Sequence, residues 1–281
     1  MKKYIAACLS AAMILALAGC SKEDSKTDAT TTTAEATTEA TTEATTEATE
    51  SETEASESET EATESEAAGD VMTYADYAAA DLDTEVTIEA YVQAKQSWWE
   101  DKATVYLQDE DGAYFCYEMA CSEDDYAKLV DGQKIRVNGF KSEWSGEVEI
   151  VDATFEIVDG NWTATPVDVT DLLGTDELVE KQNQLVSFTG MTVEASKDAD
   201  GNEVAFLYKW DGSGNEGDDL YFNVSINGET YTFTVESYLC DKDSDVYKTV
   251  SGLKVGDTVD MEGFLYWYEG VNPHITNVTV K

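Results

Sequence analysis

The chain has 281 residues, among which 59 Asp and Glu outnumber 17 Lys and Arg, so its formal net charge is −42. Charge of this sign repels phosphate groups and anionic lipids, and Arg136 is the only arginine, which argues against nucleic acid as a partner. With one histidine and few cysteines, the sequence offers neither a recognisable catalytic triad nor a metal centre built from His and Cys. We therefore expect a protein that is not an enzyme and that requires no cofactor.

The first twenty residues predict a targeting segment. Lys2 and Lys3 precede an apolar stretch, "YIAACLSAAMILALAG", that is too short to span a membrane comfortably. The stretch ends in "LAGC", which resembles the lipobox of bacterial lipoproteins, in which the cysteine is lipidated and the chain is cleaved before it. The resemblance implies a signal peptide at 1–19, lipidation of Cys20, and a protein that is exported and anchored to the outer face of the cell membrane. An ordinary secretory signal with an incidental cysteine is the alternative.

Residues 20–69 are predicted to be a disordered acidic linker. After Cys20 the segment is rich in Thr and Glu and contains no aromatic residue, Val, Ile, Leu or Pro, so it has nothing to bury. Its glutamates recur four apart, which on a helix would bring like charges together. In a surface lipoprotein of the Gram-positive type, such a linker would hold the folded part away from the membrane. A helical stalk is the alternative.

The rest of the chain predicts two mostly β domains, 70–160 and 161–281. In the first domain, alternating or apolar runs predict five strands and a short helix capped by Ser122. The strands are expected at 86–94, 103–109, 113–119, 133–140 and 146–157, with the helix after the third. Asp111-Gly112 is expected to supply the positive φ of a hairpin turn, and Asn227-Gly228 in "SINGET" (225–230) is expected to form the Asn-Gly hairpin of the second domain. Three strands, a helix and two strands is the order of the OB-fold, a five-stranded barrel.

The folded part also contains an internal repeat. "LVDGQKIRVNGFKSEWSGEVEIV" (129–151) aligns with "LKVGDTVDMEGFLYWYEGVNPHI" (253–275) at a constant offset of 124 residues. The aligned pairs include Gly132 with Gly256, Gly139 with Gly263, Trp144 with Tyr268 and Gly146 with Gly270. We therefore expect two barrels in tandem, with a longer loop between the first two strands of the second. The motifs resemble tandem OB-fold-like modules of secreted bacterial proteins, and chance similarity of short strands is the alternative.

Aromatic residues gather in the predicted loops. Trp98 and Trp99 lie between the first two strands, and because neighbours in an extended segment face opposite ways, at least one should stay exposed. Trp144 lies in the turn between the fourth and fifth strands, and the second copy has aromatic residues in equivalent loops: Trp210, Tyr266, Trp267 and Tyr268. OB-folds bind oligonucleotides and oligosaccharides with these loops and the sheet face between them. The seven residues therefore form the predicted ligand-binding set.

Charge and aromatic content together favour a neutral or cationic ligand. We predict a cell-surface lipoprotein that acts as a non-catalytic binding module and captures a neutral glycan, a peptide or a wall polymer with its aromatic loops. The alternative is a structural or protein-interaction lipoprotein whose aromatic loops pack between the two domains or against a partner protein. The sequence leaves the oligomeric state open.

Two acidic turns are candidate calcium sites. The first, "SKDADGNE" (196–203), resembles part of an EF-hand loop but has Leu207 where the bidentate Glu is expected. The second, "DKDSD" (241–245), alternates carboxylates. The candidate ligands are Asp198, Asp200, Asp241, Asp243 and Asp245. An ordinary acidic turn is the alternative for both segments.

The histidine and the remaining cysteines are predicted to be structural. His274 lies in "NPHI", which is typical of a turn that enters a strand, and no catalytic motif surrounds it. Cys116, Cys121 and Cys240 form an odd set in an exported chain, which indicates core or strand-end residues and no disulfide framework.

Overall fold

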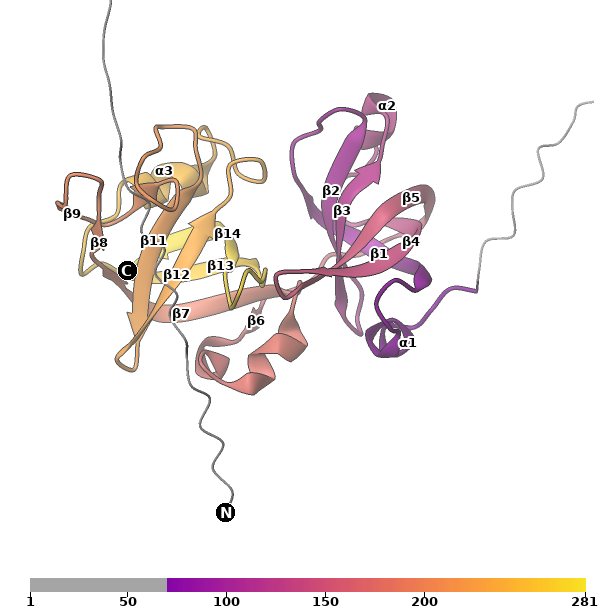
Figure 1. The fold of residues 1–281 in the computed structure, drawn as a ribbon, viewed down its shortest axis with the longest axis horizontal. Coiled ribbons are helices and arrows are strands. Elements are labelled where there is room, and N and C mark those ends of the chain that lie inside the picture. Colours follow the sequence, from indigo (N-terminus) through magenta and orange to yellow (C-terminus); the bar gives the residue numbers. More distant parts are fainter. Residues whose placement is uncertain (1–69) are drawn as a thin grey trace, which may run out of the picture. The chain divides into compact units, whose positions relative to one another are not determined.

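The computed structural model describes residues 70–281, which lie within one compact unit (Figure 1). The predicted signal peptide, the lipidation site Cys20 and the predicted acidic linker lie outside the described residues and stay predictions. Among residues 70–281, no helix has both the length and the apolar character needed to cross a membrane.

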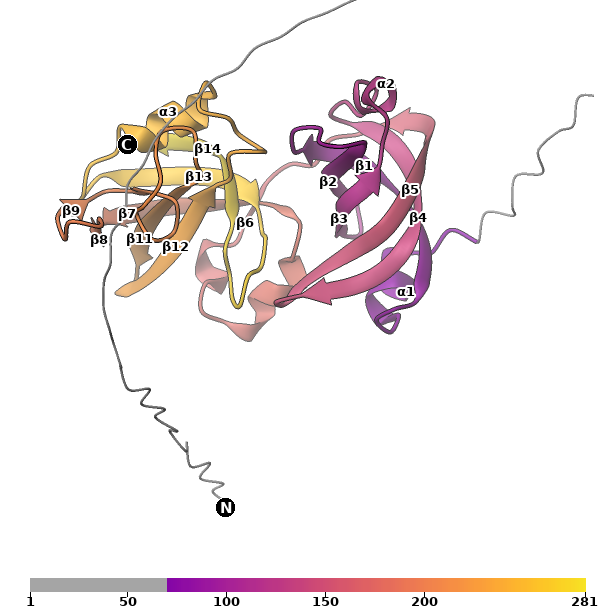
Figure 2. The same cartoon turned by 45° about the horizontal axis from the view of Figure 1, so that its top comes forward.

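The first domain is a closed barrel with strand order β1-β2-β3-β5-β4. Its elements are α1 (Tyr74–Ala79), β1 (Glu85–Lys95), β2 (Lys102–Gln108), β3 (Ala113–Ala120), α2 (Glu123–Tyr126), β4 (Gln133–Trp144) and β5 (Glu147–Asn161). This confirms the predicted order of strands and the helix after the third strand, and the Ser122 side chain caps α2 by accepting the N–H of Asp125. Figure 2 shows the long β4–β5 hairpin curving across the barrel.

The second domain is also a closed five-stranded barrel. Its ring is β7, β11, β12, β14 and β13, closed by the pairing of β11 with β7, and β10 and β6 extend it. The elements are β6 (Val167–Asp168), η1 (Thr170–Leu172), η2 (Asp176–Lys181), β7 (Leu185–Glu194), β8 (Ser196–Lys197), β9 (Glu203–Val204), β10 (Leu207–Tyr208), β11 (Leu220–Ile226), β12 (Glu229–Val235), α3 (Asp245–Ser251), β13 (Thr258–Phe264) and β14 (His274–Val280). The short strands β8, β9 and β10 occupy the enlarged loop expected between the first two strands of this copy. The fold is therefore mostly β, with two OB-like barrels in tandem.

Equivalent glycines hold equivalent places in the two barrels. Gly132 and Gly256 have φ of 82° and 91°, and each donates its N–H to a strand residue, Val92 at 2.7 Å and Val193 at 2.8 Å respectively. At a second pair of positions, a Cβ on Gly263 would lie 2.2 Å from the carbonyl oxygen of His274, and one on Gly139 would lie 2.8 Å from a backbone oxygen. Both of these glycines lie beside an irregularity in strand register, where the backbones approach closely.

The two predicted hairpin turns differ in their chemistry. Asn227-Gly228 joins β11 to β12 with φ of 55° and 88°, which confirms the Asn-Gly turn. The expected positive φ at Gly112 is wrong, because the Asp109 carboxylate shapes that turn by accepting the N–H groups of Asp111 and Gly112, each at 2.8 Å. Gly112 is needed for space instead, since a Cβ there would lie 2.3 Å from the Tyr74 ring.

An aromatic cluster joins the two barrels. Tyr106 of β2 stacks on Phe264 of β13, with ring centroids 4.2 Å apart and planes inclined by 11°. The Tyr106 hydroxyl lies 2.9 Å from Nδ1 of His274, and Phe115 meets Tyr266 edge-on at 5.4 Å. Strand β2 is buried on both faces for this reason, one face toward its own barrel and the other toward the second.

Candidate functional site

The tryptophan pair divides between a structural and an exposed position. Trp98 is half-buried, and its indole Nε1 donates to the carbonyl oxygen of Cys121 at 2.9 Å. Trp99 is 65% exposed at the tip of the β1–β2 loop, where Glu100 and Asp101 adopt positive φ. The structure therefore agrees with the expectation that at least one indole stays exposed, and that residue is Trp99.

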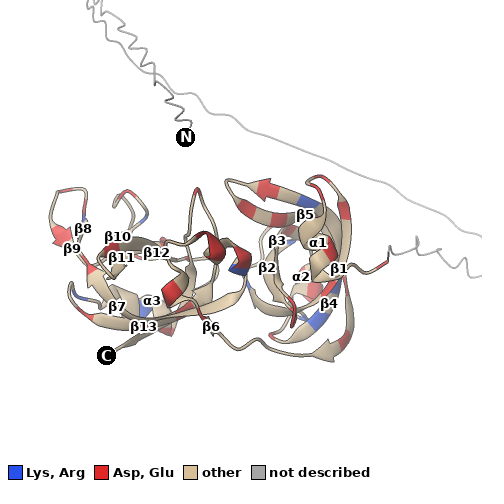
Figure 3. Cartoon of the chain, turned by 90° about the horizontal axis from the view of Figure 1, so that it is seen from below, with Lys and Arg blue, Asp and Glu red and all other residues tan. Residues whose placement is uncertain are grey.

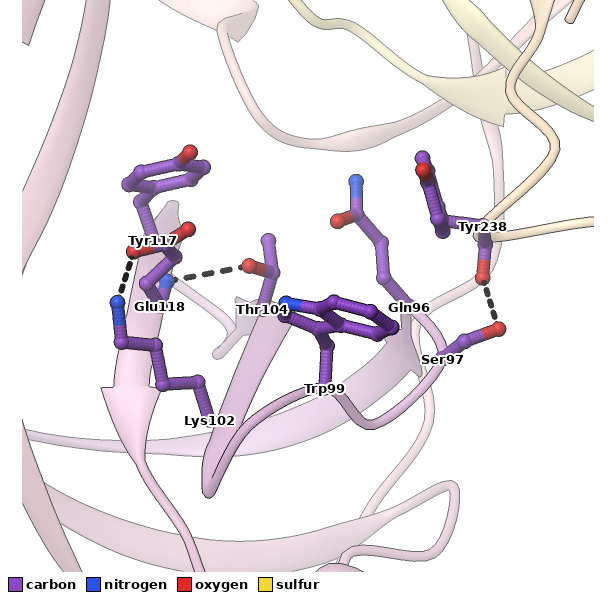
Figure 4. A pocket seen from close by; sticks show the side chains of 8 residues that line it. All are labelled: Gln96, Ser97, Trp99, Lys102, Thr104, Tyr117, Glu118 and Tyr238. Carbon is purple, nitrogen blue, oxygen red and sulfur yellow. Dashed lines mark hydrogen bonds and ion pairs between the residues drawn. The ribbon is translucent and has the colours of Figure 1, made fainter. Parts of the chain in front are cut away.

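Trp99 borders a cavity of about 390 Å³, called here the Trp99 cavity. The lining residues are Gln96, Ser97, Trp99, Lys102, Thr104, Tyr117, Glu118 and Tyr238. In Figure 4 the indole lies between Tyr117, Glu118 and Lys102 on one side and Gln96 and Tyr238 on the other. Lys102 pairs with Glu118 at 2.5 Å, so charge on this wall is internally compensated. Tyr238 comes from the second barrel, and its carbonyl oxygen accepts the N–H of Ser97 at 2.7 Å.

A larger cavity of about 590 Å³, called the Trp210 cavity, lies beside the first. The lining residues are Gln96, Trp144, Trp210, Asp219, Tyr221, Thr234, Glu236, Tyr266, Tyr268, Asn272 and His274. Gln96 lines both cavities, so the two adjoin. Five of the residues around the larger cavity are Trp or Tyr, and among all of them there is no Lys or Arg.

Trp144 and Tyr268, which the repeat alignment pairs, meet at the rim of the Trp210 cavity. Their ring centroids are 5.1 Å apart with planes inclined by 38°. Trp144 is 53% and Tyr268 45% exposed, and Trp210 is 69% exposed. Exposed rings at the rim of a cavity are available to stack on a ligand, because burial in a core does not use their faces.

Two of the predicted site residues instead help to hold the barrels together. Tyr266 meets Phe115 of the first barrel edge-on and stacks on the His274 ring at 4.3 Å, although it also lines the Trp210 cavity. The half-buried Trp267 covers Gly146, and its backbone N–H donates to the Glu147 carboxylate at 2.9 Å. Packing between the domains therefore explains why Tyr266 and Trp267 are aromatic. It also explains the contact between Trp144 and Tyr268, whose rings come from different barrels and stay about half exposed, but not the exposed rings of Trp99 and Trp210.

The acidic groups in the Trp210 cavity are Asp219 and Glu236. The Glu236 carboxylate accepts the N–H groups of Tyr238 at 3.1 Å and Leu239 at 2.8 Å. Burial is the largest influence on Glu236 and raises its pKa to about 7, above that of an ordinary glutamate. Asp219 Oδ1 accepts both the N–H and the hydroxyl of Ser237. The cavity is therefore a ring-lined space with two carboxylic acids and no Lys or Arg in its lining.

His274 is buried at the floor of this site, with 7% of its surface exposed. Burial lowers its pKa to about 3, so the ring is neutral at physiological pH, and its Nδ1 is engaged by Tyr106. The prediction of a structural histidine agrees with these contacts. Cys116 and Cys121 are buried and Cys240 is half-buried, all as free thiols.

The candidate calcium ligands hold turns in the structure. Asp198 Oδ1 accepts the N–H groups of Asp200 and Asn202, and Asp241 Oδ1 accepts that of Asp243. Asp245 is the first residue of α3. Within residues 70–281, no group of three or more His, Cys, Asp or Glu side chains is arranged to hold a metal ion. Calcium binding at these turns stays an untested prediction.

Several residues that line the cavities were not selected from the sequence: Gln96, Tyr117, Asp219, Tyr221, Glu236, Tyr238 and Asn272. Two of them carry a signal in the sequence. Tyr221 lies on the outward phase of the alternation in β11, where an aromatic ring has no place in the barrel core. Glu236 directly follows the buried end of β12. For the others, no local pattern indicates the cavity.

No protein-family model and no curated protein matches the chain. Similar solved structures include the HINa domain of Ifi202 in complex with 20-bp double-stranded DNA, with 13% identity over 71% of this chain and 96% of that chain, and a TM-score of 0.31. Another is a murine DNA-binding protein bound with double-stranded DNA, with 8% identity over 69% and 94% of the chains, and a TM-score of 0.33. A third is a replication protein A heterotrimer bound to single-stranded DNA, with 12% identity over 70% and 49% of the chains, and a TM-score of 0.29. At such identity the similarity concerns the fold alone.

The expectation that argued against nucleic acid as a partner does not hold. The matched chains are in complexes with DNA. The expectation rested on the net charge of the whole chain, which does not describe the charge of one binding face. Acidic residues are spread over both barrels, with Lys and Arg at few positions (Figure 3). Nucleic acid is therefore not excluded as a partner by the composition.

Proposed function

We propose that this protein is a lipid-anchored surface module that binds a carbohydrate polymer in the Trp210 cavity. The observation that supports it is the combination of exposed rings with hydrogen-bonding side chains around one space. Trp144, Trp210 and Tyr268 offer ring faces, and Gln96 and Asn272 line the same cavity with amide groups. A sugar presents an apolar face for stacking and hydroxyl groups for hydrogen bonds, so its chemistry fits such a lining.

The anchor is part of the same proposal and rests on the lipobox-like "LAGC". If Cys20 carries the lipid, Cys20→Ala should move the protein from the membrane fraction to the soluble fraction. A Cys20→Ala variant that stays membrane-bound and migrates like the processed wild type would contradict the anchor, whatever the protein binds.

Binding is tested with the full chain on an array of glycans and cell-wall fragments, with hits measured by tryptophan fluorescence. We expect a glycan to bind, and Trp210→Ala to weaken it by about ten-fold to a hundred-fold, which corresponds to roughly 1–3 kcal/mol for one stacked ring. Trp162→Ala is the matched control, since Trp162 packs near Tyr91 and lines neither cavity.

Single-stranded oligonucleotides are included on the same array. Glycan binding that Trp210→Ala weakens and Trp162→Ala leaves intact supports the proposal. If no glycan binds in a way that Trp210→Ala weakens, the proposed ligand is wrong. If only an oligonucleotide binds in that way, nucleic acid replaces the glycan as the ligand.

A further inference from the structure

We propose that the Trp210 cavity recognises a cationic group, an unacetylated amino sugar within the bound polymer. This rests on the proposed function and narrows its ligand from sugars in general to those that carry an ammonium group. Three features of this cavity favour such a ligand: its rings, its carboxylates and the absence of Lys and Arg from its lining.

The carboxylates of the cavity have no positively charged partner in its lining. Asp219 and Glu236 both line it. Their carboxylates accept hydrogen bonds from the N–H groups of Ser237, Tyr238 and Leu239 and from the Ser237 hydroxyl. The Trp99 cavity differs in this respect, because its Glu118 is paired with Lys102. A ligand ammonium in the Trp210 cavity would therefore meet negative charge that no Lys or Arg in the lining compensates.

Aromatic rings surround the same space. Trp144, Trp210 and Tyr268 are exposed at the rim, and Tyr221 also lines the cavity. The face of an aromatic ring attracts a cation through its quadrupole, and Trp does so most strongly. Rings combined with carboxylates are thus complementary to an ammonium group that is attached to an otherwise apolar or hydroxylated body. A neutral N-acetyl group would use the rings and leave the carboxylates without a charged partner.

Glu236 gives this recognition a measurable dependence on pH. The titratable groups around it in the cavity are Asp219, Tyr221, Tyr266 and His274, with Cys240 close by in sequence. Burial raises the pKa of Tyr221 to about 12 and that of Cys240 to about 11, while the Tyr266 pKa is raised further and that of His274 lies near 3. Tyr221, Cys240, Tyr266 and His274 therefore keep the same charge between pH 5.5 and 8. Glu236 changes its charge in this range, because its own pKa is about 7.

The experiment compares matched hexasaccharides on the full chain. The probes are β-1,4-linked hexamers of glucosamine, of N-acetylglucosamine and of N,N,N-trimethylated glucosamine. We expect the glucosamine hexamer at pH 6 to bind at least ten-fold more tightly than the acetylated one. The trimethylated hexamer has a fixed charge, so its affinity should rise between pH 5.5 and 8 as Glu236 ionises.

Variants separate recognition in the cavity from general attraction to an acidic protein. Glu236→Gln should flatten the pH profile and reduce the preference for the trimethylated over the acetylated hexamer several-fold. Glu229→Gln, an exposed residue at the start of β12, removes the same charge outside the cavity and should change neither. Trp210→Ala should weaken the binding of both charged hexamers. Thermal unfolding of each variant checks that it is folded.

The outcomes are distinguishable. Equal binding of the charged and acetylated hexamers, both weakened by Trp210→Ala, would overturn the amino-sugar inference and leave the proposed function standing. If Glu229→Gln reduces the preference for the charged hexamers as much as Glu236→Gln does, that preference reflects non-specific attraction, and the inference is overturned. Failure of all three hexamers and of every arrayed glycan to bind in a Trp210-dependent way would overturn both proposals.

Discussion

The carboxylate of Glu147, the first residue of β5, accepts the backbone N–H of Trp267 in the second barrel at 2.9 Å. Glu147 is fully buried, and Gln182 Nε2 also donates to its Oε2 at 3.2 Å. Its Oε1 and the nearby Asn183 Oδ1 are both buried without a partner. Burial raises the Glu147 pKa to about 8, so the carboxyl group holds a proton at neutral pH. The joint between the barrels is therefore built around a neutral acid.

This burial predicts that the free energy of unfolding falls as the pH rises from about 4.5 to about 8. A carboxyl group whose pKa is raised by folding favours the folded state most below its unfolded pKa, near 4.5, and this contribution is lost as pH rises through about 8. The raised pKa of Glu236 likewise lowers the free energy of unfolding as the pH rises to about 7. Each such group can contribute a slope of up to about 1.4 kcal/mol per pH unit within its window.

We expect Glu147→Gln to remove much of this slope, because the amide keeps an oxygen for the Trp267 N–H and gains a donor beside Asn183. Urea unfolding of wild type and variant at pH 5, 7 and 9 checks the prediction. Glu110→Gln, an exposed carboxylate, is the control. A wild type whose free energy of unfolding is unchanged from pH 5 to 9, with Glu147→Gln indistinguishable from it, would contradict a buried neutral Glu147.

The indole pair predicts opposite effects of two adjacent substitutions. Trp99→Ala should change the free energy of unfolding by less than about 0.5 kcal/mol, because the ring is exposed. Trp98→Ala should cost about 1–3 kcal/mol, since it removes a half-buried ring and the bond to Cys121. Thermal and urea unfolding of the two variants measure this directly. Equal losses would mean that the loop packs differently from the structure described.

The adjoining cavities predict that ligand length matters at Trp99. If a polymer bound in the Trp210 cavity continues past Gln96, Trp99→Ala should weaken hexasaccharides several-fold and leave disaccharides unaffected. Titrations of both lengths on both proteins provide the measurement. Identical losses for short and long ligands would place the Trp99 cavity outside the ligand path.

The close backbone approach at Gly263 predicts a severe effect of the smallest substitution. Gly263→Ala would bring a Cβ to 2.2 Å from the His274 carbonyl oxygen, and neither backbone can move without breaking β13–β14 pairing. We expect a loss of roughly 2–4 kcal/mol in unfolding free energy. Gly252→Ala is the control, because the nearest atom to its Cβ lies 3.4 Å away. Stability of Gly263→Ala close to that of Gly252→Ala would refute the tight crossing.

The bond between Tyr106 and His274 predicts the cost of removing one hydroxyl. Tyr106→Phe keeps the stack on Phe264 but leaves Nδ1 of His274 buried without a partner, which should cost about 1–3 kcal/mol. Tyr268→Phe, at an exposed ring, serves as the control in the same unfolding assay. The bond joins the two barrels, so a neutral Tyr106→Phe would show that the hydroxyl does not stabilise their contact.

The order of strands, the place of the short helix and the glycine positions shared by the two barrels can be predicted from the sequence alone. These features follow from local causes: alternation along a strand, a capping serine, and turns or crossings that admit no side chain. The aromatic residues lie in the expected loops, except that Trp144 is the last residue of β4, beside the expected turn. Gly112 is an exception: its turn can be predicted from the local sequence, but the glycine itself is required by the Tyr74 ring, 38 positions away.

Which of those aromatic residues face solvent depends on how the two barrels pack against each other. Trp267 and Trp144 look alike in the sequence, yet one packs over Gly146 and the other stays exposed at the cavity rim. The same holds for Glu147, one acid among 59, whose burial depends on Trp267 some 120 positions away. Burial at the joint arises from the approach of two separately patterned barrels, and no local periodicity records which face of one will meet the other.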